Sequence, residues 1–311
     1  MPRYLRYPLE AAGLFLAVGL FRLLPVDLAS NLGGFLGRTI GPRLGITRRA
    51  QRNLRLAFPE KSKAEIAGIV RGMWDNLGRV AAEYPHLGRI TARDSGRVAW
   101  VEMAPVDALG DENKPRIFVS GHLANWEIMS VAAVRRGVDL TVIVREPNNP
   151  LVRALVERLR GVAGGGRSPK GPVGAKQAVN VLRQGRVLGL LIDQKMNDGI
   201  PVPFFGIDAM TAAAPAQLAM HFKCPIVPVR IERTGPARFA ISSLPPLELP
   251  ESGDRQADAA QIMAELNHIL EGWIRARPQD WLWLHRRWPA AAYREGGPES
   301  RAAEAGSQGQ E

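Results

Sequence analysis

A histidine and a glutamate five residues apart lie directly after an apolar segment, in the stretch GHLANWE from Gly121 to Glu127. An imidazole gains and loses a proton near neutral pH and an ionised carboxylate can orient it, so His122 and Glu127 are candidates for acid–base chemistry. The preceding run RIFVS is typical of a buried strand, and Asn125 is a good N-cap for a helix that ends near Gly137. Glu127 would then lie in the first helical turn, where the positive end of the helix favours an ionised carboxylate. We expect Glu127 to contact one imidazole nitrogen and leave the other free to remove a proton.

No residue near this pair is an obvious serine or cysteine nucleophile, and no GxSxG turn occurs in the chain. The nucleophile would therefore be a hydroxyl of the substrate. Two other interpretations remain at this stage. Zinc binding is one, although there is no HExxH and no second nearby histidine or cysteine. The other is a loop histidine and a helix-turn glutamate with no chemical role.

Further polar residues follow two other strand-like runs. Arg145 comes after LTVIV, and Asp193 and Gln194 come after RVLGLLI. Carboxyl ends of parallel strands meet at one edge of a sheet, so these side chains should lie near His122. Arg145 would bind phosphate or developing negative charge there, or would simply be a solvated strand-end arginine.

Three more cations belong to the predicted site or its surroundings. Lys195 is expected to contact a headgroup rather than act as a base. Arg286 and Arg287 would contact phosphates or form a solvated basic face. The glycine-rich segment 160–174 lacks GxxxxGK[ST] and GxGxxG, so we interpret it as a mobile loop.

The order of the elements predicts an α/β protein. The first hundred residues are mostly helical, with a capping box at Ser62 and Glu65 and with Gly33, Gly34 and Gly37 allowing a close neighbour. From about residue 115, apolar runs rich in valine and isoleucine alternate with amphipathic segments, a pattern typical of a sheet covered on both faces. The tryptophans near residues 281–288 are expected to pack in the core.

Composition limits the partners. The chain has 311 residues and a formal net charge of +11, which points to anionic partners such as phospholipid, phosphorylated substrate or nucleic acid. Aromatic residues make up only 6% and no nucleic-acid-binding motif occurs, so we expect no nucleic-acid partner. The single cysteine, Cys224, excludes an intrachain disulfide and fits a reducing compartment.

The most apolar run, AAGLFLAVGLF at residues 11–21, is flanked by arginines. It is shorter than the ~20 residues that a bilayer-spanning helix needs. We expect a helix in the membrane interface, anchored by the arginines to anionic headgroups. The alternatives are a signal peptide, for which no small-residue cleavage site precedes Pro25, and a buried core helix.

GHLANWE is similar to the H-x4-D/E block of glycerolipid-type acyltransferases, and its GHxxNWE form resembles the bacterial lipid A late acyltransferase family. Further segments resemble the same family in the same order: RNLRLAFPE, WDNLGRVAAE, VIVREPNNP with Arg145, LIDQKMNDGIPVPFFG with Asp193 and Gln194, CPIVPVRIER, and DWLWLHRRW with Arg286. The resemblance spans roughly residues 5–290; the spacing of five residues matches the motif, and the acid is Glu127 rather than aspartate.

The resemblance implies a fold and an activity. It implies a glycerolipid acyltransferase-like α/β fold with a helical N-terminal region and a mixed, mostly parallel sheet. We expect a membrane-associating helix at 1–26, an acyltransferase domain at 27–293 (helical to 112, α/β from 113) and a disordered tail at 294–311. His122 would act as general base with Glu127 as its orienting acid, and Asn125, Arg145, Asp193, Gln194, Lys195 and Arg286 would bind substrate, without metal or organic cofactor.

The implied partners are acyl carrier protein as donor, a phosphorylated glycolipid acceptor of the lipid A type, and the cytoplasmic face of the inner membrane, bound peripherally or by a single anchor. Two other functions remain open at this point. One is acyl transfer to a different glycolipid or a lysophospholipid, and the other is a basic membrane-binding protein without catalytic activity.

Overall fold

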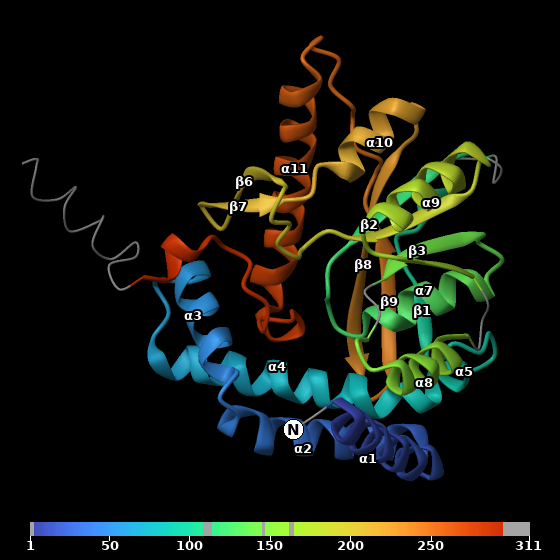
Figure 1. Cartoon of the computed structure of the whole chain (residues 1–311), viewed down its shortest axis with the longest axis vertical. Helices are drawn as coiled ribbons and strands as arrows, with labels where there is room; N and C mark the ends of the chain where they lie inside the picture. Colours follow the sequence, from blue (N-terminus) through green and yellow to red (C-terminus); the bar gives the residue numbers. More distant parts are fainter. Residues whose placement is uncertain (1–2, 108–113, 145–146, 162–164, 295–311) are drawn as a thin grey trace, which may run out of the picture.

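The computed structural model describes residues 3–107, 114–144, 147–161 and 165–294. The predicted class is confirmed: a helical N-terminal region precedes a seven-stranded, mostly parallel sheet with helices on both faces (Figure 1). Arg145 and the predicted tail from 295 onward lie outside the described residues.

The N-terminal region consists of α1 (Arg3–Leu23), α2 (Val26–Ile40), η1 (Gly41–Arg43), α3 (Thr47–Ala57), α4 (Lys63–Glu83), η2 (Tyr84–His86) and α5 (Leu87–Ile90). The predicted capping box is present at the start of α4, where Ser62 and Glu65 bond reciprocally. The glycines of α2 let it lie directly on α4, as expected. A Cβ atom added at Gly33 or Gly37 would lie 2.4 or 2.0 Å from a backbone oxygen of α4. The two helices therefore touch backbone to backbone.

The sheet has the strand order β1-β9-β8-β2-β5-β3-β4. Its elements, with the connecting helices, are β1 (Val98–Trp100), α6 (Ala104–Asp107), β2 (Arg116–Ser120), α7 (Trp126–Arg135), β3 (Leu140–Val144), α8 (Pro150–Arg160), β4 (Gly166–Pro169), α9 (Pro172–Arg183), β5 (Val187–Leu191), α10 (Ala214–Phe222), β8 (Ile226–Gly235), β9 (Arg238–Ser243) and α11 (Arg255–Ala276). Strands β2, β3, β4, β5 and β8 run parallel, so their carboxyl ends share one edge. This is the edge at which the polar residues were predicted to gather.

Two parts of the α/β region differ from the sequence prediction. The segment interpreted as a mobile loop contains β4, which pairs with β3 from Thr141↔Gly166 to Val144↔Pro169. Glycine and proline are uncommon in strands, so the composition of this segment does not predict a strand. Strand β4 lies at the edge of the sheet, where such residues are tolerated. A separate antiparallel hairpin, β6 (Ile200–Phe204) with β7 (Ile207–Thr211), follows the site segment and was not predicted.

The aromatic residues near the C-terminus pack in the core, as expected. Trp281, Trp283 and Trp288 are at most 2% exposed. Arg287 is fully buried among them and donates to Met210 O and to the Thr211 hydroxyl. Burial lowers the pKa of Arg287 to about 10. The predicted phosphate contact or solvated face is therefore wrong for Arg287, whereas Arg286 is exposed.

Helix α1 is not the buried core helix of the alternative interpretation. Ala11 is its one buried residue among the side chains described from residue 6 onward. None of the helices described is both long enough and apolar enough to cross a membrane.

Candidate active site

The His122 loop connects β2 to α7 and is held by the C-terminal segment of the chain. The Ala124 amide donates to Asp280 O at 2.9 Å, and the Leu282 amide donates to His122 O at 3.2 Å. Ala124 has φ of 45°, a left-handed conformation that costs a non-glycine residue free energy. These backbone bonds offset that cost and fix the position of His122.

Asp193, which follows the neighbouring strand β5 in the chain, orients the imidazole. Its Oδ1 lies 2.8 Å from His122 Nδ1, while Oδ2 accepts the His122 amide at 2.7 Å and the Trp281 indole N–H at 2.7 Å. The carboxylate accepts hydrogen bonds, so Nδ1 carries the proton and Nε2 has a free electron pair. The expectation that Glu127 fills this role is wrong, because Asp193 occupies Nδ1.

Asp193 is buried and His122 is partly buried, and the two side chains stabilise each other's charge. Asp193 is 3% exposed. Burial by itself raises the carboxyl pKa, but the His122 charge and the hydrogen bonds from His122 and Trp281 outweigh it and hold the pKa of Asp193 far below its usual range. Burial likewise lowers the pKa of His122, and the charge and hydrogen bond of Asp193 outweigh it, so the pKa of His122 is raised overall. The site thus strengthens the basicity of the imidazole.

The second imidazole nitrogen faces two polar side chains. The Gln194 amide nitrogen lies 3.2 Å from His122 Nε2 and 3.4 Å from His285 Nε2. The Gln194 amide donates a hydrogen bond to Nε2 of His122. The hydroxyl of a bound substrate would replace this amide as the donor to Nε2. Predicted residues His122, Asp193 and Gln194 are therefore brought together.

Glu127 lies in the first turn of α7, as predicted, but its partners are Tyr84 and Arg160. The Tyr84 hydroxyl donates to it at 2.7 Å and Arg160 Nε donates at 2.8 Å, with a second short bond from Arg160 Nη2. The Glu127 carboxylate is buried. The burial of Tyr84, together with the negative charge of Glu127, raises the pKa of Tyr84. Glu127 still acts on the histidine through space, since its negative charge contributes to the raised pKa of His122.

The remaining predicted site residues are dispersed. Asn125 stands at the N-cap position of α7 without capping it; its amide nitrogen donates to Glu83 Oε2 at 2.8 Å, and the residue is fully buried. Because no substrate can reach it, the predicted substrate contact of Asn125 is wrong. Lys195 is half-buried after Gln194, and Arg286 is exposed.

A cavity of about 1280 Å³ opens at this edge of the sheet, and His122, Glu127, Gln194 and His285 lie on its wall. The rest of the wall is largely apolar and includes Phe118, Val142, Leu190, Leu218 and Ile241. Its volume exceeds the about 300–1,000 Å³ of typical small-ligand sites. A long hydrocarbon chain would fit in such a cavity with its reacting end at the imidazole.

Four residues of the site were not found from the sequence: Tyr84, Arg160, Trp281 and His285. Trp281 and His285 lie in the segment DWLWLHRRW, whose likeness to the family's closing segment is the signal that could have found them. Tyr84 and Arg160 come from helix ends far apart in the chain, and neither carries a local pattern.

An α/β sheet with a histidine–carboxylate pair at its carboxyl edge, beside a large and mostly apolar cavity, is suited to proton transfer next to a hydrocarbon chain. The sequence model of the family described as "Bacterial lipid A biosynthesis acyltransferase" matches residues 2–290. The chain belongs to this family, and membership supports an acyltransferase acting in lipid A biosynthesis.

The curated relatives that the chain resembles are also acyltransferases of lipid A biosynthesis. The chain is 28% identical over 301 residues to the lipid A biosynthesis lauroyltransferase of Escherichia coli (strain K12), covering 92% of each protein. It is 26% identical over 263 residues to the lipid A biosynthesis myristoyltransferase of the same strain and to lipid A biosynthesis acyltransferase 1 of Shigella flexneri, covering 83% of this chain and 78% of each relative.

Proposed function

We propose that the protein transfers a fatty acyl chain from the thioester of acyl carrier protein to a hydroxyl of a lipid A precursor, with His122 as general base. The observation that carries the proposal is the Asp193–His122 pair, with Nε2 of the histidine directed to a cavity of acyl-chain size. The names of the lauroyltransferase and myristoyltransferase relatives support a saturated fatty acyl chain as the group transferred.

In the proposed reaction, Nε2 of His122 removes the proton from the acceptor hydroxyl while its oxygen attacks the thioester carbonyl. The tetrahedral oxyanion then collapses with cleavage of the C–S bond, and the departing thiolate takes the proton from the imidazolium. The Gln194 amide, 3.2 Å from Nε2, is close enough to donate to the oxyanion. Arg145, which lies outside the described residues, stays a candidate for the same task.

Glu127 has a different proposed role from the one predicted. It keeps Arg160 and Tyr84 in place and adds negative charge near the imidazole, which stabilises the imidazolium formed during the reaction. Asp193 orients the ring and Glu127 supports its charge. The sequence predicted that Glu127 orients the imidazole, whereas the proposal assigns orientation to Asp193 and charge stabilisation to Glu127.

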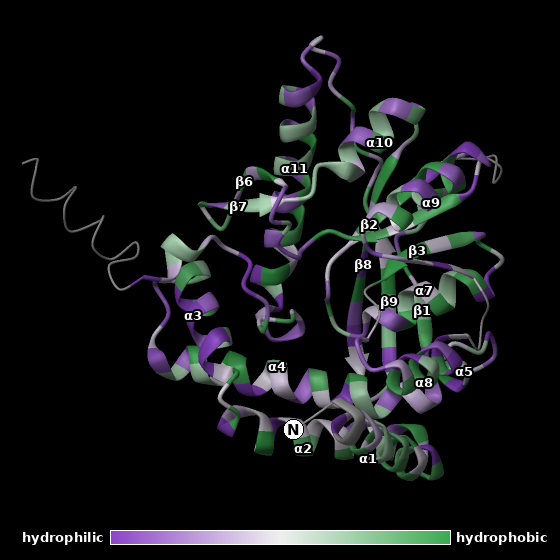
Figure 2. Cartoon of the chain, viewed as in Figure 1, coloured by the Kyte–Doolittle hydropathy of each residue, from purple (hydrophilic) through white to green (hydrophobic). Residues whose placement is uncertain are grey.

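The acceptor is proposed to come from an anionic membrane bound by α1 and α2. Most of the exposed large apolar side chains of the described residues lie on these helices and the turn after them, and Figure 2 shows the apolar colouring along them: Leu9, Phe15, Leu16, Leu20, Leu23, Leu28, Leu32, Phe35, Leu36, Ile40, Leu44 and Ile46. We call this set the apolar face. Exposed apolar surface of this extent marks an interaction site, and neighbouring arginines suit anionic headgroups.

The apolar face lies close to the reactive edge of the sheet. Helix α1 packs on η2 and α8, the elements that supply Tyr84 and Arg160 to the Glu127 cluster. A lipid acceptor in the bilayer would therefore meet the active-site side of the protein. This arrangement supports peripheral attachment to the inner membrane at its cytoplasmic face, where acyl carrier protein is present.

Replacing His122 with alanine tests the catalytic proposal against the non-catalytic alternative. The variant should lose acyl transfer from acyl carrier protein to a lipid A precursor, by about 10²-fold or more, while keeping its thermal midpoint and its binding to anionic vesicles. An unchanged rate would contradict the role of His122. Activity on a lysophospholipid in place of the lipid A precursor would favour the alternative acceptor.

A further inference from the structure

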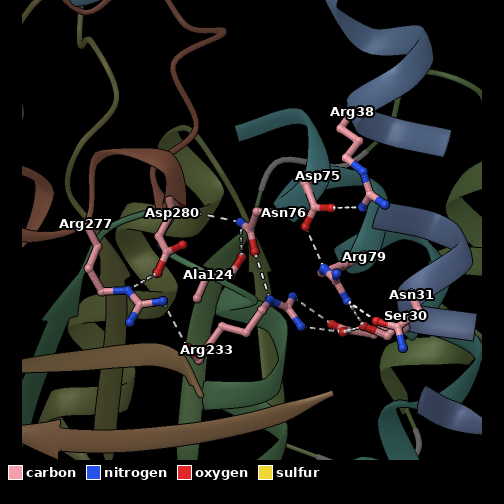
Figure 3. A network of polar contacts seen from close by, with 11 residues as sticks. Ser30, Asn31, Arg38, Asp75, Asn76, Arg79, Ala124, Arg233, Arg277 and Asp280 are labelled. Atoms are coloured by element: carbon pink, nitrogen blue, oxygen red, sulfur yellow. Dashed lines mark hydrogen bonds and ion pairs between the residues drawn. The ribbon is translucent and has the colours of Figure 1, made fainter. Parts of the chain in front are cut away.

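A second cavity, of about 510 Å³, lies between α2, α4, the turn that joins β8 to β9, and the segment around Asp280. It shares no lining residue with the large cavity at His122. Figure 3 shows the polar network in its wall, where α2 and α4 meet the C-terminal segment. It is an open hollow on the protein surface rather than an enclosed pocket.

Arginines dominate the lining of this cavity. Five of them contribute to it, against two aspartates: Arg38, Arg71, Arg79, Arg233 and Arg277, with Asp75 and Asp280. Counting Glu83, which pairs with Arg233, five guanidinium groups meet three carboxylates, an excess of two positive charges. A phosphate monoester carries about −1.5 to −2 at neutral pH, so the charges match.

Ion pairs hold most of these guanidinium groups in fixed positions. Asp75 serves two of them, with Arg38 Nη1 and Arg79 Nε each 2.6 Å from one of its oxygens. Arg277 Nε lies 2.6 Å from Asp280 Oδ2, and its Nη2 donates to Arg233 O. Since one aspartate neutralises only one of its two arginines, the cluster keeps a positive excess in a preorganised arrangement.

Arg71 supplies the other uncompensated charge. It lies on the same face of α4 as Asp75 and Arg79, is exposed, and makes no hydrogen bond or ion pair within the described part of the chain. A guanidinium group has five N–H donors. Arg71 therefore offers a full set of donors at the mouth of the cavity.

The cavity borders the apolar face defined above. Arg38 belongs to α2, and its guanidinium carbon lies 5.4 Å from the ring centre of the exposed Phe35. A phosphate in the cavity would thus lie beside apolar side chains that enter the bilayer. This position suits a phosphate carried on a lipid better than one free in solution.

We propose that this arginine cavity binds the phosphate monoester headgroup of a lipid. The inference concerns binding alone and is independent of the chemistry proposed at His122. The cavity is also connected to the His122 loop: the Asn76 amide donates to Ala124 O at 2.9 Å, and Arg233 Nε donates to the Asn76 side chain at 3.1 Å. A bound headgroup would therefore stabilise the wall that supports the strained residue before the active-site helix.

The test measures sedimentation of the full-length protein with phosphatidylcholine vesicles that contain phosphatidic acid, a monoester, or phosphatidylglycerol, a diester, at matched surface charge. The wild type should prefer phosphatidic acid. Arg71→Gln should reduce that preference by about tenfold, the effect of losing a charge-assisted pair. Arg71→Lys should retain part of it, since the charge remains without the planar fork.

Arg55→Gln is the matched control, because Arg55 is an exposed arginine on α3 outside the cavity. It should weaken binding to both vesicle types equally. If Arg71→Gln behaves like Arg55→Gln, the arginines provide only general attraction and the proposal is overturned. A rise in thermal midpoint with inorganic phosphate, without preference for phosphatidic acid, would overturn the lipid assignment. None of these measurements depends on acyl transfer.

Discussion

His122 can act as a base only when its Nε2 is unprotonated, and Asp193 makes that nitrogen more basic. Because the pKa of His122 is raised, the acid limb of kcat/KM should lie above the ~6.5 of an unperturbed histidine. Asp193→Asn should lower the limb and reduce kcat/KM by about 10²-fold or more. The measurement is the pH profile of both proteins, with the exposed Asp208→Asn as control. Superimposable profiles would remove Asp193 from the mechanism.

The same pair should also contribute to stability as a function of pH. A raised His122 pKa stabilises the fold below the unfolded pKa, and this contribution disappears as pH rises through the folded value. A lowered Asp193 pKa stabilises the fold above the unfolded pKa of ~3.9, and this contribution disappears as pH falls toward the folded value. The wild type should therefore have a higher free energy of unfolding than Asp193→Asn. This difference should be largest between about pH 3.9 and about pH 6.5 and should decline on either side. A difference independent of pH would contradict the ion pair.

Glu127 and Arg160 should behave as one unit. Glu127→Gln leaves the partly buried Arg160 guanidinium without its partner charge, so both turnover and unfolding free energy should fall, turnover by about 10²-fold. Arg160→Gln should have a similar effect, and the double variant should be little worse than either single variant. The double-mutant cycle is read in both quantities. Additive losses would show that the two residues act separately.

The identity of the partner of His122 shows where sequence reasoning ends. Glu127 is close in the chain and was expected to bond the imidazole, whereas Asp193 follows a strand seventy residues later. Asp193 reaches the imidazole because β5 pairs with β2, placing Leu191 opposite Ser120. Both residues were candidates from their types and their positions after strands, but their pairing depends on the strand order. No spacing along the chain specifies that order.

Among the elements, apolar runs were the reliable signal. The segments 116–120 and 140–144 are strands as predicted, because mostly apolar runs that contain valine and isoleucine suit a sheet buried on both faces. Strand β4 was missed because Gly166 and Pro169 disfavour strands in isolation, and only pairing with β3 stabilises it. Helix α1, at Arg3–Leu23, lies within the helix predicted at 1–26, and the apolar run at 11–21 is its most hydrophobic part.

The α2–α4 packing gives a prediction with an internal control. A Cβ atom at Gly78 would lie 2.1 Å from Gly33 O, while one at Gly68, on the same helix, would contact nothing within 4 Å. Gly78→Ala should therefore lower the free energy of unfolding by about 1–3 kcal/mol by separating the helices. Gly68→Ala should leave it unchanged or raise it by up to ~1 kcal/mol, since alanine favours helix. Chemical denaturation of the two variants gives the comparison; equal values would mean that the helices do not need close contact.

Considered as a whole, the molecule presents its apolar face and its reactive edge on the same side. The sequence predicted only α1 as the membrane element, because residues 11–21 form the most apolar run. Helix α2 was assigned to packing, and its glycine side does pack on α4, but its leucines and Phe35 are exposed. Exposure depends on which face the neighbouring helix covers, so tertiary contacts decide it and composition does not.

Because both helices carry the apolar face, removal of α1 alone should reduce membrane binding without abolishing it. A chain beginning near Val26 keeps the exposed side chains of α2, so it should retain part of its binding to anionic vesicles. Serine substitutions distinguish the two helices without removing either: Leu16 and Leu20 on α1, Leu32 and Leu36 on α2. Each pair should weaken binding, and the four together should abolish most of it at every salt concentration, because burial of apolar area is not screened as charge is. The measurement is vesicle sedimentation across a salt series, with Val173→Ser, an exposed position on α9 away from these helices, as control.

Turnover on lipid in a bilayer should fall with binding, while turnover on detergent-dispersed lipid should change little. If the α2 pair alone left binding intact, membrane attachment would belong to α1 only.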